Sequence, residues 1–404
     1  MKRIWFVSHY SMPPEYEMRI KTQMFSHYLN EMGYETEIFS ASTIHNTNIN
    51  LINDNSKYIS RTYDDLNFVH VNCHNYSGNG FRRIRNMLEF SNKFKKIAKF
   101  FKLPDIVIAD VNCVNYSSIY KFCKMHNIKF YIDIRDLWPM SIIEYLGYSK
   151  NNPIIKYLYY REKIMYKRAN GIIFSMEGGK DYIQDKGWDN IISLKKVYNI
   201  NNGINLEIFN KNRELYKFND TDLDNNNVFK VIYVGSIRKA NNLKDLIDCA
   251  FLLKKENISF ILYGDGEDKD DLENYSKKNN INVVFKGHVE KKYIPYVLSK
   301  SDLNILNYKQ GNAWKYGGSQ NKLFEYFASG KPVLANIEMG CCLIKRYNCG
   351  ISGNINSPKD YAQAILKIKS LSLKDYQEYC NNAIKAANDF DYKALTDKLI
   401  EIID

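Results

Sequence analysis

Short apolar runs alternate with helical patterns along almost the whole chain, and this alternation constrains the fold more than any other feature. In the first half, runs rich in β-branched or aromatic residues predict buried strands. These runs lie at Ile4–Val7, Glu37–Phe39, Ile106–Ala109, Phe130–Ile132 and Gly171–Phe174. Helical patterns separate them, such as the one from Met18 to Met32, which Gly33 ends. Strands that alternate with helices predict a parallel sheet covered on both faces.

A second alternating series follows a polar segment at residues 219–227, which consists almost entirely of Asn and Asp and predicts an exposed linker. Helical patterns again separate the predicted strands, and residues 359–403 are predicted to be helical throughout. These strands lie at Lys230–Val234, Ser259–Tyr263, Val283–Phe285, Leu303–Leu306 and Pro332–Leu334. A chain of 404 residues fits two or three domains at roughly 150 residues each. The simplest interpretation is an α/β protein with two doubly wound domains in series.

The net charge of +12 implies an anionic partner, which leaves nucleic acid, anionic lipid and phosphorylated substrates open. The apolar run after Met1-Lys2-Arg3 is too short for a signal peptide, and no run approaches the roughly 20 residues that span a bilayer. Eight cysteines without zinc-site spacing fit reduced thiols in a cytoplasm.

The most informative stretch is Lys315–Leu334, in which a loop with two glycines leads from a predicted strand into a predicted helix. Gly317 and Gly318 allow the backbone to approach a ligand closely. Ser319 or Gln320 would stand at the helix N-terminus, where unpaired N–H groups and the helix dipole favour an anion.

Two charged residues follow on that helix. Lys322 adds positive charge near its N-terminus, and Glu325 lies three residues later on the same face. A carboxylate beside a phosphate site suits a vicinal diol. The alternative is an ordinary strand-loop-helix with a surface Glu.

Two further glycine turns follow predicted strands of the second series. In Tyr233–Leu243, Arg238 and Lys239 precede a helix and are suited to hold phosphate oxygens. Tyr263–Glu267 contains Gly-Asp-Gly but lacks the last Gly of a dinucleotide fingerprint. Turns at the carboxyl ends of strands in one sheet converge on one crevice.

Two Asp-x-Asp runs resemble a metal site, but their positions favour structural roles. Asp222–Asp224 lies in the polar linker, and Asp268–Asp270 opens a predicted helix, where acidic residues complement the dipole. We therefore expect no bound metal and no cofactor. His9, at the end of the first strand, is either a buried structural residue or a group that faces a ligand.

The second half resembles the nucleotide-binding domain of the family-4 retaining glycosyltransferases of the GT-B fold. The nearest likeness is to bacterial capsule and O-antigen enzymes, including L-fucosamine-type transferases. The segments that carry the resemblance are Gly235–Leu243, Tyr263–Glu267, Phe285–Val289, Ile294-Pro295 and Lys315–Leu334, with Pro13-Pro14, Arg19, Asp133–Pro139 and Asn202-Gly203 in the first half. The resemblance implies two Rossmann-like domains that face each other across a cleft. Residues 1–205 would bind the acceptor and residues 206–387 the donor, with a C-terminal helix at about 388–404 packed back on the first domain.

The resemblance also implies roles for individual residues. Arg238 and Lys239 would hold the donor diphosphate, Glu325 the ribose hydroxyls, and the backbone near His288 the base. The donor-binding set is Gly235, Ser236, Arg238, Lys239, Gly264, Gly266, His288, Val289, Gly318, Ser319, Asn321, Lys322 and Glu325. Asp136, with Arg238 and Lys239, would be catalytic, and His9, Arg19 and Arg135 would lie on the acceptor side.

The chain departs from the family pattern at three places. The family has two glutamates eight positions apart; Glu325 fits the second, but the first falls at Gly317. Ser319 or a backbone N–H would then replace the contact of the first Glu with the donor sugar. Arg135 stands where many members have His, and Glu15-Tyr16-Glu17 stands where a glycine pair usually follows Pro13-Pro14.

The segment Arg82–Lys102 carries eight basic residues and one acid, Glu89. A helical wheel predicts an amphipathic helix with Arg82, Arg85, Lys93, Lys96 and Lys99 opposite an apolar face of Ile84, Met87, Leu88, Phe94, Ile97, Ala98 and Phe101. This cationic side is either a solvated helix face or, together with Tyr157–Arg168, a surface for anionic lipid.

The favoured function is metal-independent, retaining transfer of a sugar from a nucleotide diphosphate donor, expected to be UDP-linked, to a lipid-linked saccharide in bacterial surface polysaccharide synthesis. The acceptor is expected to be linked to undecaprenyl diphosphate, and the enzyme to be cytoplasmic and peripheral at the inner membrane face. The alternatives are a nucleotide-sugar 2-epimerase on the same fold and a basic nucleic-acid-binding protein. No nucleic-acid recognition motif is present, so no nucleic-acid partner is expected.

Overall fold

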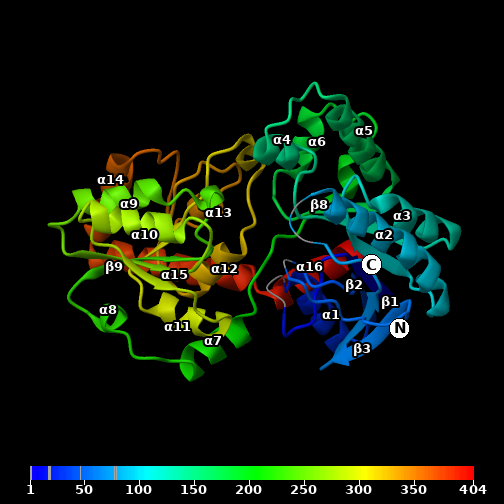
Figure 1. Ribbon diagram of the computed structural model, residues 1–404, viewed down its shortest axis with the longest axis horizontal. Coiled ribbons are helices and arrows are strands. Elements are labelled where there is room, and N and C mark those ends of the chain that lie inside the picture. Colours follow the sequence, from blue (N-terminus) through cyan, green and yellow to red (C-terminus); the bar gives the residue numbers. More distant parts are fainter. Residues whose placement is uncertain (1, 17–19, 46, 77, 79) are drawn as a thin grey trace. The chain divides into compact units, whose positions relative to one another are not determined.

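The computed structural model describes residues 2–16, 20–45, 47–76, 78 and 80–404 (Figure 1). Within these residues the chain forms two compact units. The first contains residues up to Asn201 together with Leu395–Asp404, and the second contains Asn202–Ala394.

The sheet of the first unit has the strand order β3-β4-β2-β1-β5-β6-β7-β8. All neighbouring strands pair in parallel except β3, which forms an antiparallel hairpin with β4. The strands are β1 (Arg3–Ser8), β2 (Glu35–Ala41), β3 (Tyr58–Tyr63), β4 (Leu66–Val71), β5 (Ile106–Asp110), β6 (Lys129–Ile134), β7 (Gly171–Phe174) and β8 (Val197–Asn199).

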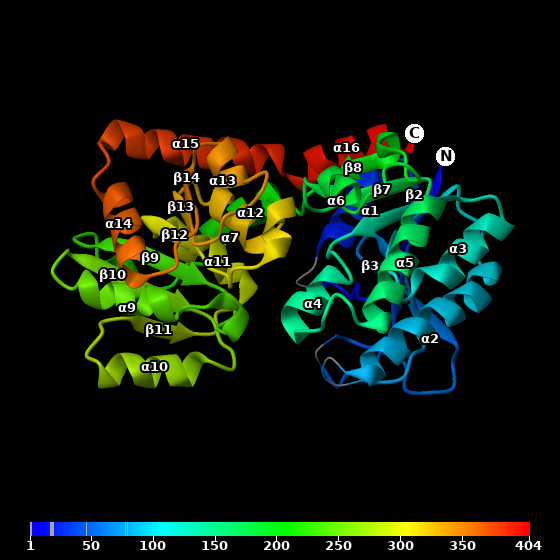
Figure 2. The ribbon, with the colours of Figure 1, turned by 90° about the horizontal axis from the view of Figure 1, so that it is seen from above.

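Helices cover both faces of this sheet, as the alternating pattern predicts (Figure 2). On β1, Trp5 packs against Phe122 on one face, whereas the next residue, Phe6, lies on the other face with Phe25 and Leu399. The helical segments are α1 (Lys21–Glu31), α2 (Phe81–Ile97), η1 (Ala98–Phe100), α3 (Tyr116–Met125), α4 (Met140–Leu146), α5 (Pro153–Arg168), α6 (Gly179–Asp185), η2 (Leu194–Lys196) and α16 (Tyr392–Ile403).

The α2 helix buries most of its predicted apolar face, but two of its residues, Leu88 and Lys93, differ from the helical-wheel prediction. Leu88 is 41% exposed because it lies near the exposed Arg85 and Asn92 on the helix surface. Lys93 was expected on the cationic side, but it is half-buried; its amine pairs with Glu89 at 2.6 Å and donates a hydrogen bond to the Asn72 carbonyl. Arg82, Arg85, Lys96 and Lys99 are exposed, as predicted.

The sheet of the second unit is parallel throughout, with the strand order β11-β10-β9-β12-β13-β14. The chain order reverses between β9 and β12, which is the switch point where doubly wound sheets bind ligands. The strands are β9 (Phe229–Val234), β10 (Ile258–Tyr263), β11 (Val284–Gly287), β12 (Leu303–Leu306), β13 (Val333–Ala335) and β14 (Gly350–Ser352).

Helices pack on both faces of this sheet too. On one face Ile247 and Tyr361 are fully buried in a core with Val231 and Ile305 of the strands. On the other, α12 packs along α15, and Phe324 lies 5.1 Å from Phe390 between ring centroids. The segments are α7 (Leu206–Leu215), α8 (Thr221–Asp224), η3 (Lys239–Asn241), α9 (Lys244–Leu252), α10 (Lys269–Lys278), η4 (Lys291–Tyr293), α11 (Ile294–Ser299), η5 (Asn312–Tyr316), α12 (Asn321–Ala328), α13 (Leu343–Arg346), α14 (Pro358–Lys369) and α15 (Leu373–Asp389).

Candidate functional site

Three loops at the carboxyl ends of β9, β10 and β11 are held together by their backbones. The Gly235 N–H donates to the Tyr263 carbonyl at 2.9 Å, and the Gly264 N–H donates to the Gly287 carbonyl at 2.7 Å. Gly264 has φ +145°, and a Cβ there would lie 1.8 Å from the Gly235 carbonyl oxygen. Only glycine permits this approach, so the predicted glycine turns form one surface at this edge of the sheet.

The side chain of Lys322, from the first turn of α12, lies over this surface. Its amine donates a hydrogen bond to the Tyr233 hydroxyl at 3.2 Å and lies 4.6 Å from the centroid of the Tyr233 ring and 5.0 Å from that of Tyr308. A Cβ at Gly235 would lie 2.6 Å from the amine nitrogen. The amine therefore sits between two aromatic rings and a glycine backbone, at the switch point between β9 and β12.

No carboxylate compensates this lysine within the part of the chain that the structure describes. Burial lowers the pKa of Lys322 from 10.5 to about 7. The helix begins at Asn321 without a side-chain cap on its first N–H groups. A half-buried, unneutralised amine next to uncapped helix amides is suited to receive an anion such as a phosphate.

Arg238 and Lys239 stand on the loop that follows β9, at the start of η3. Both are exposed, and the described residues offer neither side chain a hydrogen bond or an ion pair. Asn307, at the end of β12, fixes this loop because its side-chain amide donates to the carbonyls of Asn241 at 3.0 Å and Asn242 at 2.8 Å. The two cations are thus carried on an anchored loop beside the switch point.

Glu325 is buried on α12, and its carboxylate pairs with the amine of Lys291. Lys291 opens η4, directly after the loop that contains His288 and Val289. His288 is exposed and Val289 is half-buried. The residues expected to bind ribose and base therefore belong to neighbouring elements, and their ligand roles stay predictions.

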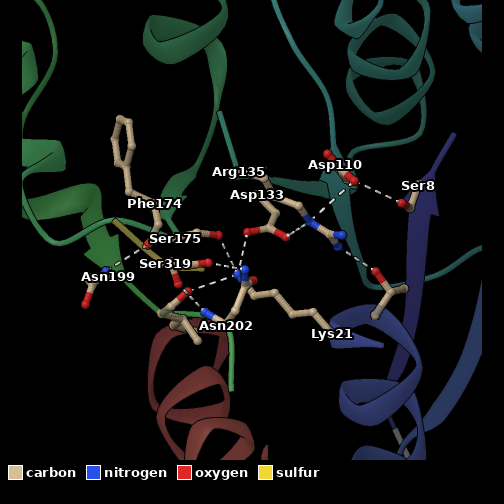
Figure 3. A network of polar contacts seen from close by, with 12 residues as sticks. Ser8, Lys21, Asp110, Asp133, Arg135, Phe174, Ser175, Asn199, Asn202 and Ser319 are labelled. Atoms are coloured by element: carbon tan, nitrogen blue, oxygen red, sulfur yellow. Dashed lines mark hydrogen bonds and ion pairs between the residues drawn. The ribbon is translucent and has the colours of Figure 1, made fainter. Parts of the chain in front are cut away.

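The loop that precedes α12 is held by Asn202. The Asn202 backbone N–H donates to the Ser319 hydroxyl at 2.7 Å, and its side-chain amide donates to the Ser319 carbonyl at 2.6 Å (Figure 3). Within this loop Gly317 has φ +90°, and a Cβ at Gly318 would lie 2.3 Å from the Gln320 amide nitrogen. Among the remaining predicted donor-site residues, Ser236 and Asn321 are exposed, and Gly266 packs its backbone against Ile237.

A second polar cluster lies at the carboxyl edge of the first unit's sheet (Figure 3). The Lys21 amine donates to Asp133 at 2.9 Å, to Ser175 at 3.0 Å and to the Ile200 carbonyl at 2.9 Å. Arg135 donates to Asp133 at 3.0 Å. Burial lowers the pKa of Lys21. Burial alone would raise the pKa of Asp133, but Lys21 and Arg135 outweigh it and lower that pKa.

The residues predicted on the acceptor side are dispersed. Arg135 belongs to the cluster just described. His9 is buried, its Nε2 lies 2.5 Å from the Asn86 side-chain oxygen, and burial lowers its pKa to about 4, so the ring is neutral. Asp136 is exposed on the loop after β6. Arg19 lies outside the described residues.

The Asp-x-Asp run in the linker is occupied by lysines. Asp222 pairs with Lys286 at 2.6 Å and Asp224 pairs with Lys300 at 3.0 Å. Among the described residues, no group of three or more His, Cys, Asp or Glu is arranged to hold a metal ion. The two ion pairs favour the structural interpretation of this run.

Sequence reasoning missed the residues that define the electrostatics of the candidate site around Lys322. Tyr233 and Tyr308 enclose the Lys322 amine, and Lys291 holds Glu325. In the sequence, Tyr233 has the pattern of an ordinary buried strand residue. Lys291 lies among other basic and polar residues in sequence, so no local signal marks either of them.

Comparison with known proteins agrees with this arrangement. Residues 217–389 match the family model of the group 1 glycosyl transferases. A Bacillus subtilis (strain 168) protein named as a teichuronic acid biosynthesis glycosyltransferase, TuaH, is 26% identical over 206 residues, which are 50% of this chain and 49% of that protein. The chain thus aligns with about half the length of this curated relative.

Solved structures resemble the chain over nearly its full length. They include sucrose-phosphate synthase from Thermosynechococcus elongatus (TM-score 0.73, 14% identity, 100% of this chain and 98% of that one). An E. coli trehalose-6-phosphate structure bound with UDP-2-fluoro glucose has a TM-score of 0.74 at 12% identity, with 99% and 98% covered. Anabaena HepE in complex with UDP and glucose has a TM-score of 0.67 at 14% identity, with 99% of each chain covered. This likeness shows the fold, and the predicted GT-B class with two parallel-sheet α/β domains is confirmed.

Proposed function

We propose that this protein is a glycosyltransferase that binds a nucleoside diphosphate sugar at the carboxyl edge of the β9–β14 sheet. The observation that carries the proposal is the uncompensated Lys322 amine, which lies over the Gly235 backbone at the switch point and next to the uncapped start of α12. A diphosphate supplies the charge that this site lacks. The group 1 family match over the same unit supports the assignment.

The reaction breaks the bond between the sugar C1 and a diphosphate oxygen and forms a bond between C1 and the acceptor oxygen. The acceptor proton passes to the leaving diphosphate or to water. Lys322, Arg238, Lys239 and the first amides of α12 would stabilise the negative charge that develops on the diphosphate. This electrostatic role needs no pair of catalytic carboxylates.

The finer parts of the proposal are a UDP-linked donor, retention at C1, and a lipid-linked acceptor in surface polysaccharide synthesis. The UDP in two of the similar structures supports a UDP-linked donor. The name of the B. subtilis relative supports a role in surface polysaccharide synthesis. The ion pairs of Asp222 and Asp224 support catalysis without a divalent cation at that run. Asp136 is proposed to be catalytic, and its exposure at the carboxyl end of β6 supports this role.

We also propose that the first unit docks on an anionic membrane surface through α2, α3 and α5, which pack side by side. Large apolar side chains are exposed there among the cations: Phe81 is 78% exposed, Ile154 66% and Tyr160 60%. The exposed cations of these helices are Arg82, Arg85, Lys96, Lys99, Lys121, Lys124, Lys156, Lys167 and Arg168. Such a mixture suits the lipid interface. Among the described residues, no helix is both long and apolar enough to cross a bilayer.

The test of the main proposal is a panel of nucleoside diphosphate sugars scored by thermal stabilisation. A ligand at 100 times its Kd stabilises the protein by about 2.7 kcal/mol. We expect UDP and at least one UDP-sugar to raise Tm, and the responding sugar to be transferred to a lipid-linked saccharide. Absence of stabilisation by every member of the panel would contradict the proposal. Conversion of the donor to its epimer without an acceptor would favour the epimerase instead.

A further inference from the structure

Asn202, the first residue of the second unit, makes two hydrogen bonds to a single residue of the loop before α12. Its backbone N–H donates to the Ser319 hydroxyl at 2.7 Å, and its side-chain amide donates to the Ser319 carbonyl at 2.6 Å (Figure 3). Together these bonds fix both the side chain and the peptide orientation of Ser319.

Among the described residues, few other hydrogen bonds hold this loop. It runs from Gly317, which follows η5, to Gln320, which precedes α12, and its first two residues are glycines. Its backbone bonds lie at its two ends: the Gly317 N–H donates to the Trp314 carbonyl at 3.0 Å, and the Gln320 carbonyl accepts from the Leu323 N–H at 3.0 Å. Two consecutive glycines leave a loop conformationally free unless outside contacts hold it.

Asn202, in contrast, is firmly placed. Two residues later, the Ile204 N–H donates to the Phe390 carbonyl at 3.0 Å, and the Ile204 carbonyl accepts from the Tyr392 N–H at 2.9 Å. Asn202 therefore links the loop at Gly317–Gln320 to the firmly held segment that joins α15 and α16.

The strand order indicates what this loop faces. Lys322 marks the proposed diphosphate position between β9 and β12, and Glu325 pairs with Lys291, which follows the loop after β11. If the nucleoside lies on the β10–β11 side of the diphosphate, the sugar, which is attached to the other end of the diphosphate, lies on the β12 side. The loop at Gly317–Gln320 follows β12, so it would face the sugar.

We infer that Asn202 is a positioning residue for the donor sugar. It holds Ser319 and the neighbouring backbone amides in the conformation that contacts the sugar. This loop, Gly317–Gln320, contains two glycines and no carboxylate. The inference rests on the proposed donor site. It predicts that loss of the Asn202 amide affects the sugar and leaves the nucleotide unaffected.

The experiment compares Asn202→Ala with the wild type in two measurements. The first is the Kd for UDP, and the second is kcat and KM with the sugar nucleotide that the wild type turns over. We expect an unchanged Kd for UDP and a fall of about tenfold in kcat, because one hydrogen bond to the sugar-contacting loop is lost. Ser319→Ala should have a similar effect, and Ser319→Thr, which keeps the hydroxyl, should restore activity.

Two further variants separate positioning from general damage. Asn202→Ala combined with Ser319→Ala should lose more kcat than either single variant while the Kd for UDP stays unchanged, because the two substitutions remove different hydrogen bonds to the same loop. Asn199→Ala is the matched control: it removes a bond of the same kind, from a side-chain amide to the Phe174 carbonyl at 3.0 Å, within the first unit. Its kcat should equal that of the wild type.

The outcomes are distinguishable. Wild-type kcat in Asn202→Ala overturns the inference, and so does an equal loss of UDP and sugar-nucleotide affinity, which would indicate damage to the whole site. If the wild type binds UDP and transfers sugar, the proposed function stands whatever the variant does. If the wild type binds no nucleotide, both the function and the inference fail.

Discussion

Replacement of Lys322 by Met tests the donor site most sharply, because the structure gives both the sign and the size of the expected effect. Burial lowers the pKa of this lysine from 10.5 to about 7. At about 1.36 kcal/mol per pKa unit, the folded protein disfavours the ammonium form by about 5 kcal/mol relative to the unfolded chain. Methionine retains an unbranched apolar chain and carries no charge, so the variant is free of this cost.

The direction in which stability changes with pH follows from the number of protons that the folded and the unfolded states bind. Between pH 7 and 10.5 the unfolded chain keeps a proton on Lys322 that the folded protein releases, so the free energy of unfolding of the wild type rises with pH. For this one group the rise from pH 7 to pH 9 is about 2 kcal/mol. In urea unfolding, Lys322→Met should exceed the wild type in stability at pH 7, and its advantage should shrink by about that amount at pH 9.

Lys286→Met is the matched control in the same unit. Burial opposes the charge on Lys286, but Asp220 and Asp222 outweigh it and raise its pKa. The stabilising contribution of such a lysine is fully present below pH 10.5 and is lost only as the pH rises through the raised pKa. Lys286→Met should therefore lower the stability by the same amount at pH 7 and pH 9.

A bound diphosphate should favour the ammonium form of Lys322 again. Binding of UDP at pH 8 should then take up about one proton, which calorimetry in two buffers of different ionisation enthalpy measures. Lys322→Met should bind UDP more weakly and take up no proton on binding. If the stability difference between variant and wild type does not change with pH, or if both take up the same number of protons, the assignment of Lys322 to the diphosphate is wrong.

Three further predictions concern the rest of the proposal. Glu325→Gln should weaken UDP binding by about 1.5–3 kcal/mol in calorimetry, since a charged acceptor is lost, and Glu290→Gln, an exposed neighbour, should not. Transfer activity should persist in EDTA, and loss in EDTA with recovery on adding magnesium or manganese would show that a cation is needed. Co-sedimentation with anionic liposomes at low salt should disappear when four exposed cations become Gln, while UDP binding stays intact; equal sedimentation of wild type and variant would reject the membrane surface. These four cations are Arg82, Arg85, Lys96 and Lys99.

Much of the fold could be predicted from the sequence, because strand and helix periodicities are local signals. The strands Gly171–Phe174 and Leu303–Leu306 have the predicted bounds. The hairpin of β3 and β4 was missed because β3 is partly exposed and has no continuous apolar run, although β4 is buried at all but one position. The helical stretch after residue 358 is divided at residues 370–372 and 390–391, where Ser372 caps α15. The linker contains the short helix α8, capped by Asp220.

Only the part of the candidate site that is formed by backbone loops was predictable from the sequence. Glycines that follow strands indicate where loops approach one another, and the structure joins Gly235 and Gly264 there. The partners of charged side chains depend on contacts between distant elements, which no local pattern contains. The sequence placed Lys322 and Glu325 on one helix, but the pairing of Glu325 with Lys291, 34 residues away, appears only in the folded chain.

The uncompensated amine of Lys322 also bears on selectivity. A neutral ligand at the switch point would leave the amine without an anionic partner, and the cost of burying its charge would remain. An anionic ligand offsets that cost through charge-assisted hydrogen bonds, which are the stronger kind. In the proposed reaction the same attraction would increase when the sugar bond breaks and the diphosphate gains charge, so the site would stabilise the transition state more than the bound donor. The lysine that destabilises the empty site is therefore suited to favour both the binding of a diphosphate and its departure from the sugar.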